Sequence, residues 1–137
     1  MKVLITGGSG FIGSHLVEHF QGRAEVRVLD DFSTGFRQNL TGLDCEILEG
    51  SIENTELLSQ ALRDIDLVFH LAAMISVPQS MTQPHECVRL NVTGTLNVLE
   101  AAAKAGAKKF VLASSAAIYG DNPVVPKVES MFPEPKS

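Results

Sequence analysis

Apolar residues in this 137-residue chain fall into short runs that alternate with helical patterns. Branched apolar residues are concentrated in five segments, which predicts β-strands over residues 2–6, 25–30, 45–49, 66–71 and 109–113. The run at 66–71 is almost continuously apolar, as in a strand that is buried on both faces. The chain therefore offers the strands of one sheet.

Helical spacing of apolar residues separates these strands. Residues 11–20 and 54–62 each show an apolar face, and Asn54 is suited to cap the second helix. The longest helix is predicted over residues 84–105, and Gly106 is suited to end it. Because this helix is apolar on more than one side, we expect it to be covered on two faces.

The alternation of strands and helices predicts an α/β fold. We expect a doubly wound parallel sheet of about five strands, with helices on both faces, over residues 1–121. Four prolines after Gly120 make residues 122–137 a loop: Pro123, Pro126, Pro133 and Pro135. At this length the chain is one globular domain.

Composition narrows the function classes. The net charge of -5 argues against a nucleic-acid-binding surface, and no apolar run reaches the roughly 18 residues that span a bilayer. Cys45 and Cys87 lie far apart, which indicates neither a disulfide framework nor a metal site. We interpret His15 and His19 as solvated helix residues, since no third ligand is evident, and expect no metal. A soluble, cytoplasmic domain is the resulting prediction.

The strongest motif is the glycine-rich segment at residues 6–13, TGGSGFIG, between a predicted strand and a predicted helix. This context is typical of dinucleotide-binding turns. Gly7 would permit the tight turn, Gly10 would let a pyrophosphate approach the backbone, and Gly13 would let the helix pack on the strand. The helix N-terminus would then face the anion.

An acidic pair at the end of the second predicted strand indicates the cofactor. Asp30 is placed to accept hydrogen bonds from the adenosine ribose, and a carboxylate there would repel a 2′-phosphate. Asp31 adds a second negative charge. Arg37 follows and could favour NADP, but the two acids are closer to the turn, so we predict NAD.

Four segments in order are similar to those of the extended short-chain dehydrogenase/reductase family: residues 6–16, 70–73 (HLAA), 91–95 (NVTGT) and 114–120 (SSAAIYG). Within it the whole chain most resembles NAD-dependent nucleotide-sugar epimerases, above all the 4-epimerases that act on UDP-glucose or UDP-N-acetylglucosamine. The resemblance implies a Rossmann-type fold, a nucleotide-sugar substrate, and a homodimer formed through the long helix.

The resemblance also implies roles for individual residues. Ser115 would be catalytic and would position the sugar hydroxyl that is oxidised; Ser76 and Gln79 would contact substrate with it. Where the family often has an Asp that binds the adenine amino group, this chain has Ser51, whose hydroxyl could partly replace it. The cofactor-binding residues would be Gly7, Gly10, Phe11, Ile12, Gly13, Asp30, Asp31, Ser51, Ile52, Leu71, Ala72, Ala73 and Asn91.

Two family motifs that this chain lacks narrow the predicted reaction. Dehydratases that resemble this chain have an Asp-Glu pair after the hydroxyl residue, but this chain has Ala116 and Ala117, which disfavours dehydration. The family's general base is a Tyr followed four residues later by a Lys, whereas Tyr119 is followed at that distance by Pro123. We therefore expect the chain to be the cofactor-binding part of a protein about twice as long.

The predicted function is NAD-dependent epimerisation of a nucleotide sugar at C4 through a 4-keto intermediate. Without the Tyr-Lys pair the chain itself should bind NAD but turn over little substrate. Its fifth strand would be an exposed edge, and the chain would then tend to self-associate. A related nucleotide-sugar decarboxylase or reductase, and a non-catalytic NAD-binding module, are the alternatives.

Overall fold

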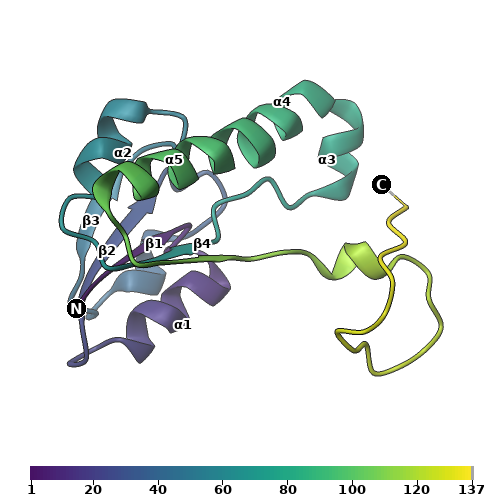
Figure 1. Cartoon of the computed structure of the whole chain (residues 1–137), viewed down its shortest axis with the longest axis horizontal. Coiled ribbons are helices and arrows are strands. Elements are labelled where there is room, and N and C mark those ends of the chain that lie inside the picture. The colour runs from purple at the N-terminus through teal and green to yellow at the C-terminus, as the bar shows by residue number, and fades with distance from the viewer. Residues whose placement is uncertain (137) are drawn as a thin grey trace.

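A computed structural model of the chain, which describes residues 1–136, contains one five-stranded sheet (Figure 1). All neighbouring strands are parallel, and their order across the sheet is β3-β2-β1-β4-β5. This order confirms the predicted Rossmann-type, doubly wound sheet. The strands are β1 (Lys2–Thr6), β2 (Glu25–Asp30), β3 (Glu46–Glu49), β4 (Leu67–His70) and β5 (Lys109–Leu112).

The helical segments agree with the predicted helices and add several short ones. They are α1 (Phe11–His19), the 3-10 turn η1 (Arg37–Leu40), α2 (Thr55–Ala61), α3 (Val77–Thr82), α4 (Pro84–Val88), the π-helical turn η2 (Arg89–Gly94), α5 (Thr95–Ala105) and the 3-10 turn η3 (Ala116–Tyr119). The helix predicted over 84–105 is thus divided by a π-turn. The side chain of Asn54 caps α2 and Gly106 ends α5 with a φ of 77°, both as predicted.

Helices cover both faces of the sheet (Figure 1). Because side chains alternate along a strand, Val3 and Ile5 of β1 point to one face, where they pack with Val17 of α1. Leu4 points to the other face and packs in one cluster with Leu58 of α2 and Val98 of α5. The two layers leave the carboxyl ends of the strands open, which is where a site can form.

The long helix is covered on one face only within residues 1–136. Its buried side holds Val98 and Ala102, but Val88, Val92, Leu96 and Leu99 form an exposed apolar stripe. The expectation that it is covered on two faces is therefore half met. Strand β5 is one edge of the sheet and pairs with β4 alone, so the expected exposed edge is present.

After η3 the chain forms a loop without helix or strand over residues 120–136. The loop returns to its start, because the Glu134 amide donates a hydrogen bond to the Ile118 carbonyl at 2.6 Å. A Cβ at Gly120 would lie 2.1 Å from the Glu134 carbonyl oxygen, so a glycine is required at this crossing. Ser137, the last residue of the predicted loop, lies outside the described residues.

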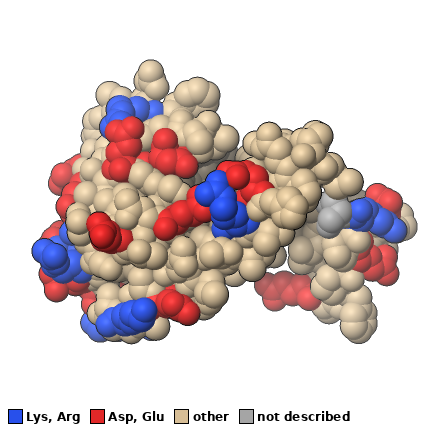
Figure 2. Space-filling view, turned by 90° about the horizontal axis from the view of Figure 1, so that it is seen from above, with Lys and Arg blue, Asp and Glu red and all other residues tan. Residues whose placement is uncertain are grey.

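Charged side chains of both signs are interspersed on the face seen from above (Figure 2). Among the described residues, each helix is too short or too polar to cross a bilayer. The same residues contain no cluster of three or more His, Cys, Asp or Glu side chains that could hold a metal ion.

Candidate functional site

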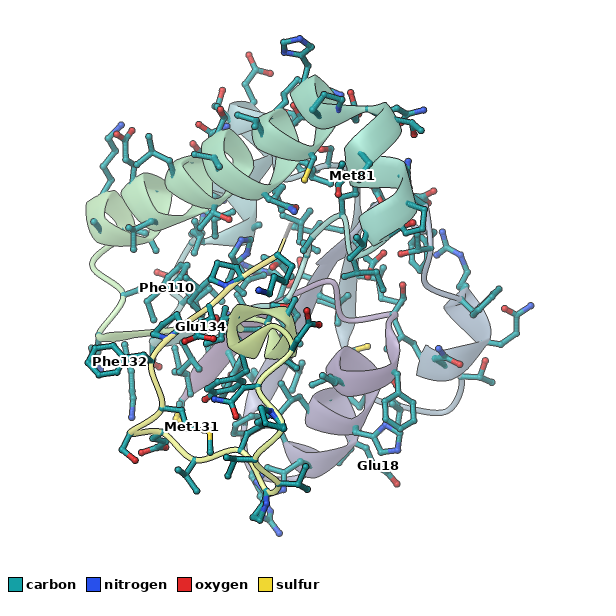
Figure 3. The ribbon with its side chains drawn as sticks, turned by 90° about the vertical axis from the view of Figure 1, so that its right-hand side faces the viewer. Glu18, Met81, Phe110, Met131, Phe132 and Glu134 are labelled. Carbon is teal, nitrogen blue, oxygen red and sulfur yellow. The ribbon has the colours of Figure 1, made fainter. Side chains whose placement is uncertain are left out.

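A cavity of about 790 Å³ runs along the carboxyl edge of the sheet and is lined by the turns after all five strands. In open parallel sheets, ligands bind at this edge where the strand order reverses, here between β1 and β4. Figure 3 faces this edge and shows α3, with Met81, and the tail, with Phe132 and Glu134, on different sides. Pro135 of the tail also lines the cavity.

The glycine turn between β1 and α1 forms one wall of the cavity. Gly7 has a φ of 70°, and a Cβ there would lie 2.8 Å from the Ala72 nitrogen, so the turn abuts the end of β4. A Cβ at Gly13 would lie 2.2 Å from the Gly7 carbonyl oxygen, whereas one at Gly10 would meet nothing closer than 3.4 Å. Gly7 and Gly13 therefore serve packing within the chain, and Gly10 leaves the cavity side open.

The first turn of α1 presents amide groups to this wall. Its N-cap is Gly10, which supplies no side-chain hydrogen bond, so the first N–H groups of the helix have no capping partner from that residue. Gly10, Phe11, Ile12 and Gly13 all line the cavity. This end of the helix is suited to bind an anionic group such as a phosphate.

Asp30 lies at the end of β2 and links the glycine turn to the next loop. It is 8% exposed; its Oδ2 accepts a hydrogen bond from the Ser9 amide and its Oδ1 one from the Phe32 amide, both at 2.8 Å. Asp31 accepts from the Ser33 amide and hydroxyl, at 2.9 and 2.6 Å. Each carboxylate oxygen can accept further bonds, so this end of the cavity favours hydroxyl donors and disfavours anions.

Arg37 does not offset these two acids, because other groups hold it. Its Nη2 lies 2.6 Å from Glu49 Oε2, and its guanidinium carbon lies 4.1 Å from the centre of the Phe32 ring. Arg37 is also absent from the cavity lining. The negative charge of Asp30 and Asp31 therefore dominates here.

The segment after β4 forms the opposite wall with Leu71, Ala72 and Ala73. Asn91 of η2 holds the continuation of this segment: its Oδ1 accepts from the Met74 amide at 2.8 Å, and its Nδ2 donates to the Met74 carbonyl at 3.0 Å. Asn91 lines the cavity as well, but its amide group already binds the backbone. Its geometry is that of a clamp on the cavity wall.

Ser51 and Ile52 line the cavity at the end of β3. The Ser51 hydroxyl accepts a hydrogen bond from the Glu53 amide at 3.2 Å. Ile52 is 3% exposed and packs tightly on η2, since a Cβ at Gly94 would lie 2.6 Å from Ile52 Cδ1. Ile52 is thus fixed by the core, and the Ser51 hydroxyl also donates to Glu53 Oε2 at 3.5 Å.

The far half of the cavity holds two serines that cap short helices. Ser76 Oγ accepts from the Gln79 amide at 3.3 Å, and Ser115 Oγ accepts from the Ala117 amide at 3.1 Å. Both serines line the cavity, whereas Gln79 does not, because its side chain donates to Gln83, just after α3, at 3.2 Å. Except for Gln79, the structure brings all of the predicted site residues to one cavity.

Several lining residues were not predicted as site residues. His70, expected in the buried strand and the HLAA segment but given no role, lies under the cavity with burial lowering its pKa to about 4. Cys87 and Thr95 line it from the long helix. Gly8, left without a role, packs on the sheet, since a Cβ there would lie 2.6 Å from Val28 Cγ1. The adjacency of His70 to Leu71 and Ala72 was the available signal.

Comparison with known proteins identifies relatives along the whole chain. The sequence profile of the NAD dependent epimerase/dehydratase family matches residues 3–137. The chain is 42% identical to UDP-glucose 4-epimerase of Klebsiella pneumoniae over 139 residues, which cover 95% of this chain and 100% of that sequence. It is 37% identical to UDP-glucuronic acid decarboxylase 1 of Arabidopsis thaliana, covering 96% of this chain and 30% of the relative.

A solved structure has the same fold. Thermus thermophilus UDP-glucose 4-epimerase in complex with NAD superposes with a TM-score of 0.90 at 40% identity, over 100% of this chain and 45% of that one. The chain thus spans the whole Klebsiella sequence but less than half of the Arabidopsis and Thermus proteins.

Proposed function

Because the chain belongs to the NAD dependent epimerase/dehydratase family, we propose that it is the NAD-binding part of a nucleotide-sugar 4-epimerase of the UDP-hexose type. The observation that carries this proposal is the single cavity that joins the glycine turn, Asp30 and Ser115. The relatives named UDP-glucose 4-epimerase, and the NAD complex of one of them, support the choice of reaction and cofactor.

The residues present fit NAD. The open side of Gly10 and the uncapped first turn of α1 suit a pyrophosphate, and the carboxylate of Asp30 suits the adenosine ribose hydroxyls. Asp31 disfavours a 2′-phosphate by repulsion. We assign adenine to Ser51 and Ile52. The wall formed by Leu71, Ala72 and Ala73, which Asn91 supports, would bind the nicotinamide half.

Bound NAD supplies the hydride acceptor and donor for the sugar C4 carbon. Ser115 would orient the sugar, because its Oγ accepts from the Ala117 amide and its hydroxyl proton remains available for the C4 oxygen. Ser76 and Gln79 are assigned to the sugar side of the same cleft; Gln79 would have to leave Gln83 to reach it. Ala116 and Ala117 carry no acid or base, which favours epimerisation over water elimination.

The proton acceptor is assigned to a part of the protein outside this chain. Tyr119 is the one tyrosine of the sequence, it does not line the cavity, and Pro123 stands four positions later. The relatives that are more than twice as long have room for the tyrosine-lysine pair and for a substrate region. We therefore expect the 137-residue chain to bind NAD with little turnover.

The first test is calorimetric titration of the chain with NAD and NADP. We expect NAD to bind more tightly, and Asp30→Asn to weaken NAD binding about tenfold by removing a charge-assisted hydrogen bond. Glu18→Gln is the matched control, since Glu18 is a carboxylate on α1 outside the cavity lining. Equal affinity of D30N and wild type for NAD would contradict the ribose assignment.

The second test uses the full-length protein with UDP-glucose or UDP-N-acetylglucosamine. Formation of the C4 epimer without net change of NAD supports the proposal. No conversion of either sugar with NAD bound would contradict it and favour a non-catalytic NAD-binding module. Loss of CO₂ from a UDP-hexuronate, or net NAD reduction, would favour the decarboxylase or reductase alternative, which the Arabidopsis relative makes specific.

We further propose a cytoplasmic homodimer. Val88, Val92, Leu96 and Leu99 form an apolar stripe that a second copy of the helix could cover. Both cysteines are free thiols, which suits a reducing compartment. Light scattering of the full-length protein should give a dimer, and Leu96→Glu should give a monomer. A dimer that persists in L96E would show that the interface does not include this stripe.

A further inference from the structure

A buried chain of hydrogen bonds lies beneath the cavity and joins three elements. His70, at the end of β4, is 2% exposed; its Nδ1 lies 2.7 Å from the Thr6 hydroxyl of β1, and its Nε2 lies 3.0 Å from the Thr95 hydroxyl of α5. Thr6 is fully buried. The two strands that flank the reversal of strand order are thus tied to the long helix through one imidazole.

The neighbours of Thr6 determine the direction of the first bond. Its Oγ1 accepts from the amides of Leu71 and Ala72, at 3.2 and 3.3 Å. The Leu71 amide is shared with the Thr6 carbonyl oxygen at 3.1 Å, and both amides face the hydroxyl oxygen as donors, which directs the hydroxyl proton to His70 Nδ1. Nδ1 is therefore the unprotonated nitrogen of the ring.

The second bond follows from the first. A neutral imidazole that accepts at Nδ1 carries its proton on Nε2, which then donates to the Thr95 hydroxyl. Thr95 in turn donates to the carbonyl oxygen of Asn91 at 2.7 Å. The Thr95 proton is thus taken by the Asn91 carbonyl, which also requires Nε2 to be the donor to Thr95, and the order of the protons is fixed from β1 to the helix.

The amides held by Thr6 belong to the cavity wall. Leu71 and Ala72 line the cavity, and the Ala72 nitrogen is also the nearest atom to the missing Cβ of Gly7. The position of the Thr6 hydroxyl thus sets how the wall after β4 meets the glycine turn. His70 fixes that hydroxyl by accepting its proton.

Building on the proposed function, we infer that neutral His70, protonated at Nε2, is a positioning residue for the NAD site: through Thr6 it holds the Leu71–Ala72 backbone against the glycine turn. The half of the network that contains Nδ1 serves the cofactor wall. The half that contains Nε2 anchors the helix. Because the two halves act on different elements, breaking one half at a time distinguishes a positioning role of His70 from simple packing.

Two substitutions divide the network. His70→Asn places an amide oxygen near the position of Nδ1 and can accept from Thr6, but is too short for Thr95. His70→Gln reaches Thr95 but offers no acceptor at the Nδ1 position. We expect H70Q to bind NAD about tenfold more weakly than wild type and H70N to stay within about threefold, although each loses one hydrogen bond of the network, buried at Thr6 and partly buried at Thr95.

The measurements are NAD titration of the wild-type chain, both variants and the E18Q control, with urea unfolding of each. A two-bond ¹H–¹⁵N spectrum of the wild-type chain reports the tautomer directly and is expected to show Nδ1 unprotonated. Equal loss of NAD affinity in H70N and H70Q, or a proton on Nδ1, would overturn the inference. A wild-type chain that binds no NAD would instead contradict the proposed function, and the tautomer spectrum would still test the network.

Discussion

Arg27 provides the sharpest test of what stabilises the fold around the site. This residue is in the middle of β2, and its side chain is 10% exposed. Its Nη1 donates to the carbonyl oxygens of Gln60, Ala61 and Arg63 at 3.2, 2.8 and 3.1 Å. These carbonyls lie at the end of α2, where backbone donors run out: Gln60 still accepts from the Arg63 amide at 3.2 Å, whereas Ala61 and Arg63 depend on Arg27. Arg27 is therefore a cap supplied by the sheet.

The same guanidinium also forms an ion pair, and removing the ion pair should lower the free energy of unfolding less than removing the cap. Its Nε donates to Glu46 Oε2 at 2.7 Å, but the Glu46 side chain is 54% exposed, so the pair should contribute at most about 1 kcal/mol. The Ala61 and Arg63 carbonyls lose their donor in Arg27→Met, and an unsatisfied buried acceptor costs about 1–3 kcal/mol. Two of the three bonds are only partly buried. We therefore expect R27M to lose about 3 kcal/mol in total.

Urea unfolding followed by circular dichroism at neutral pH measures these losses. Glu46→Gln is the matched control, because it removes the ion pair and leaves the cap, and should cost at most about 1 kcal/mol. Arg27→Lys keeps the charge but not the fork of donors, and should lie between the two. If R27M were no less stable than E46Q, the bonds from Arg27 to the carbonyls would contribute nothing to stability.

Gly13→Ala should abolish measurable NAD binding, because its Cβ would lie 2.2 Å from the Gly7 carbonyl oxygen; an unchanged dissociation constant in a calorimetric titration would refute this. Burial lowers the pKa of His70 from 6.5 to about 4, so between pH 6.5 and pH 4 the imidazole is protonated in the unfolded chain but not in the folded one. The contribution of neutral His70 to the free energy of unfolding is fully present above pH 6.5. In urea titrations this free energy should fall by about 3 kcal/mol as the pH is lowered towards 4, and H70N should lack this loss. Burial, and secondarily the charge of Asp44, raises the pKa of the Cys45 thiol, so iodoacetamide should alkylate it more slowly at pH 8 than it alkylates glutathione.

The fold could be predicted because its signals are local and periodic. Each strand follows from a run of branched apolar residues, and Asn54 and Gly106 mark helix ends through backbone chemistry that needs no tertiary contact. The short helix α3 was not predicted. It begins at the Ser76 cap, and none of its residues is buried, so it leaves no periodic apolar pattern in the sequence.

The residue types at the site could be predicted, but their bonds could not. Asp30 was expected to face a ribose, and the sequence does not reveal that both of its oxygens also hold backbone amides of the glycine turn and the next loop. Asn91 was expected to bind cofactor, yet its amide clamps Met74. The bonds from Ser9 to Asp30 and from Met74 to Asn91 join residues 21 and 17 positions apart and depend on the register of packed elements.

The π-turn explains why the long helix was predicted to be apolar on more than one side. Cys87, Asn91 and Thr95 all line the cavity, although they are spaced by four residues. Four residues exceed an α-helical turn of 3.6 by about 40°, so two such steps would drift about 80° around a regular helix. The wider turn at Arg89–Gly94 takes up this excess, as π-turns at functional sites do. It keeps the clamp and the partner of His70 on the cavity while Val98, further along, stays in the core. On a regular helix of 3.6 residues per turn, Cys87, Asn91 and Thr95 would spread over a broad part of the surface. The second apolar side is the exposed stripe of Val88, Val92, Leu96 and Leu99.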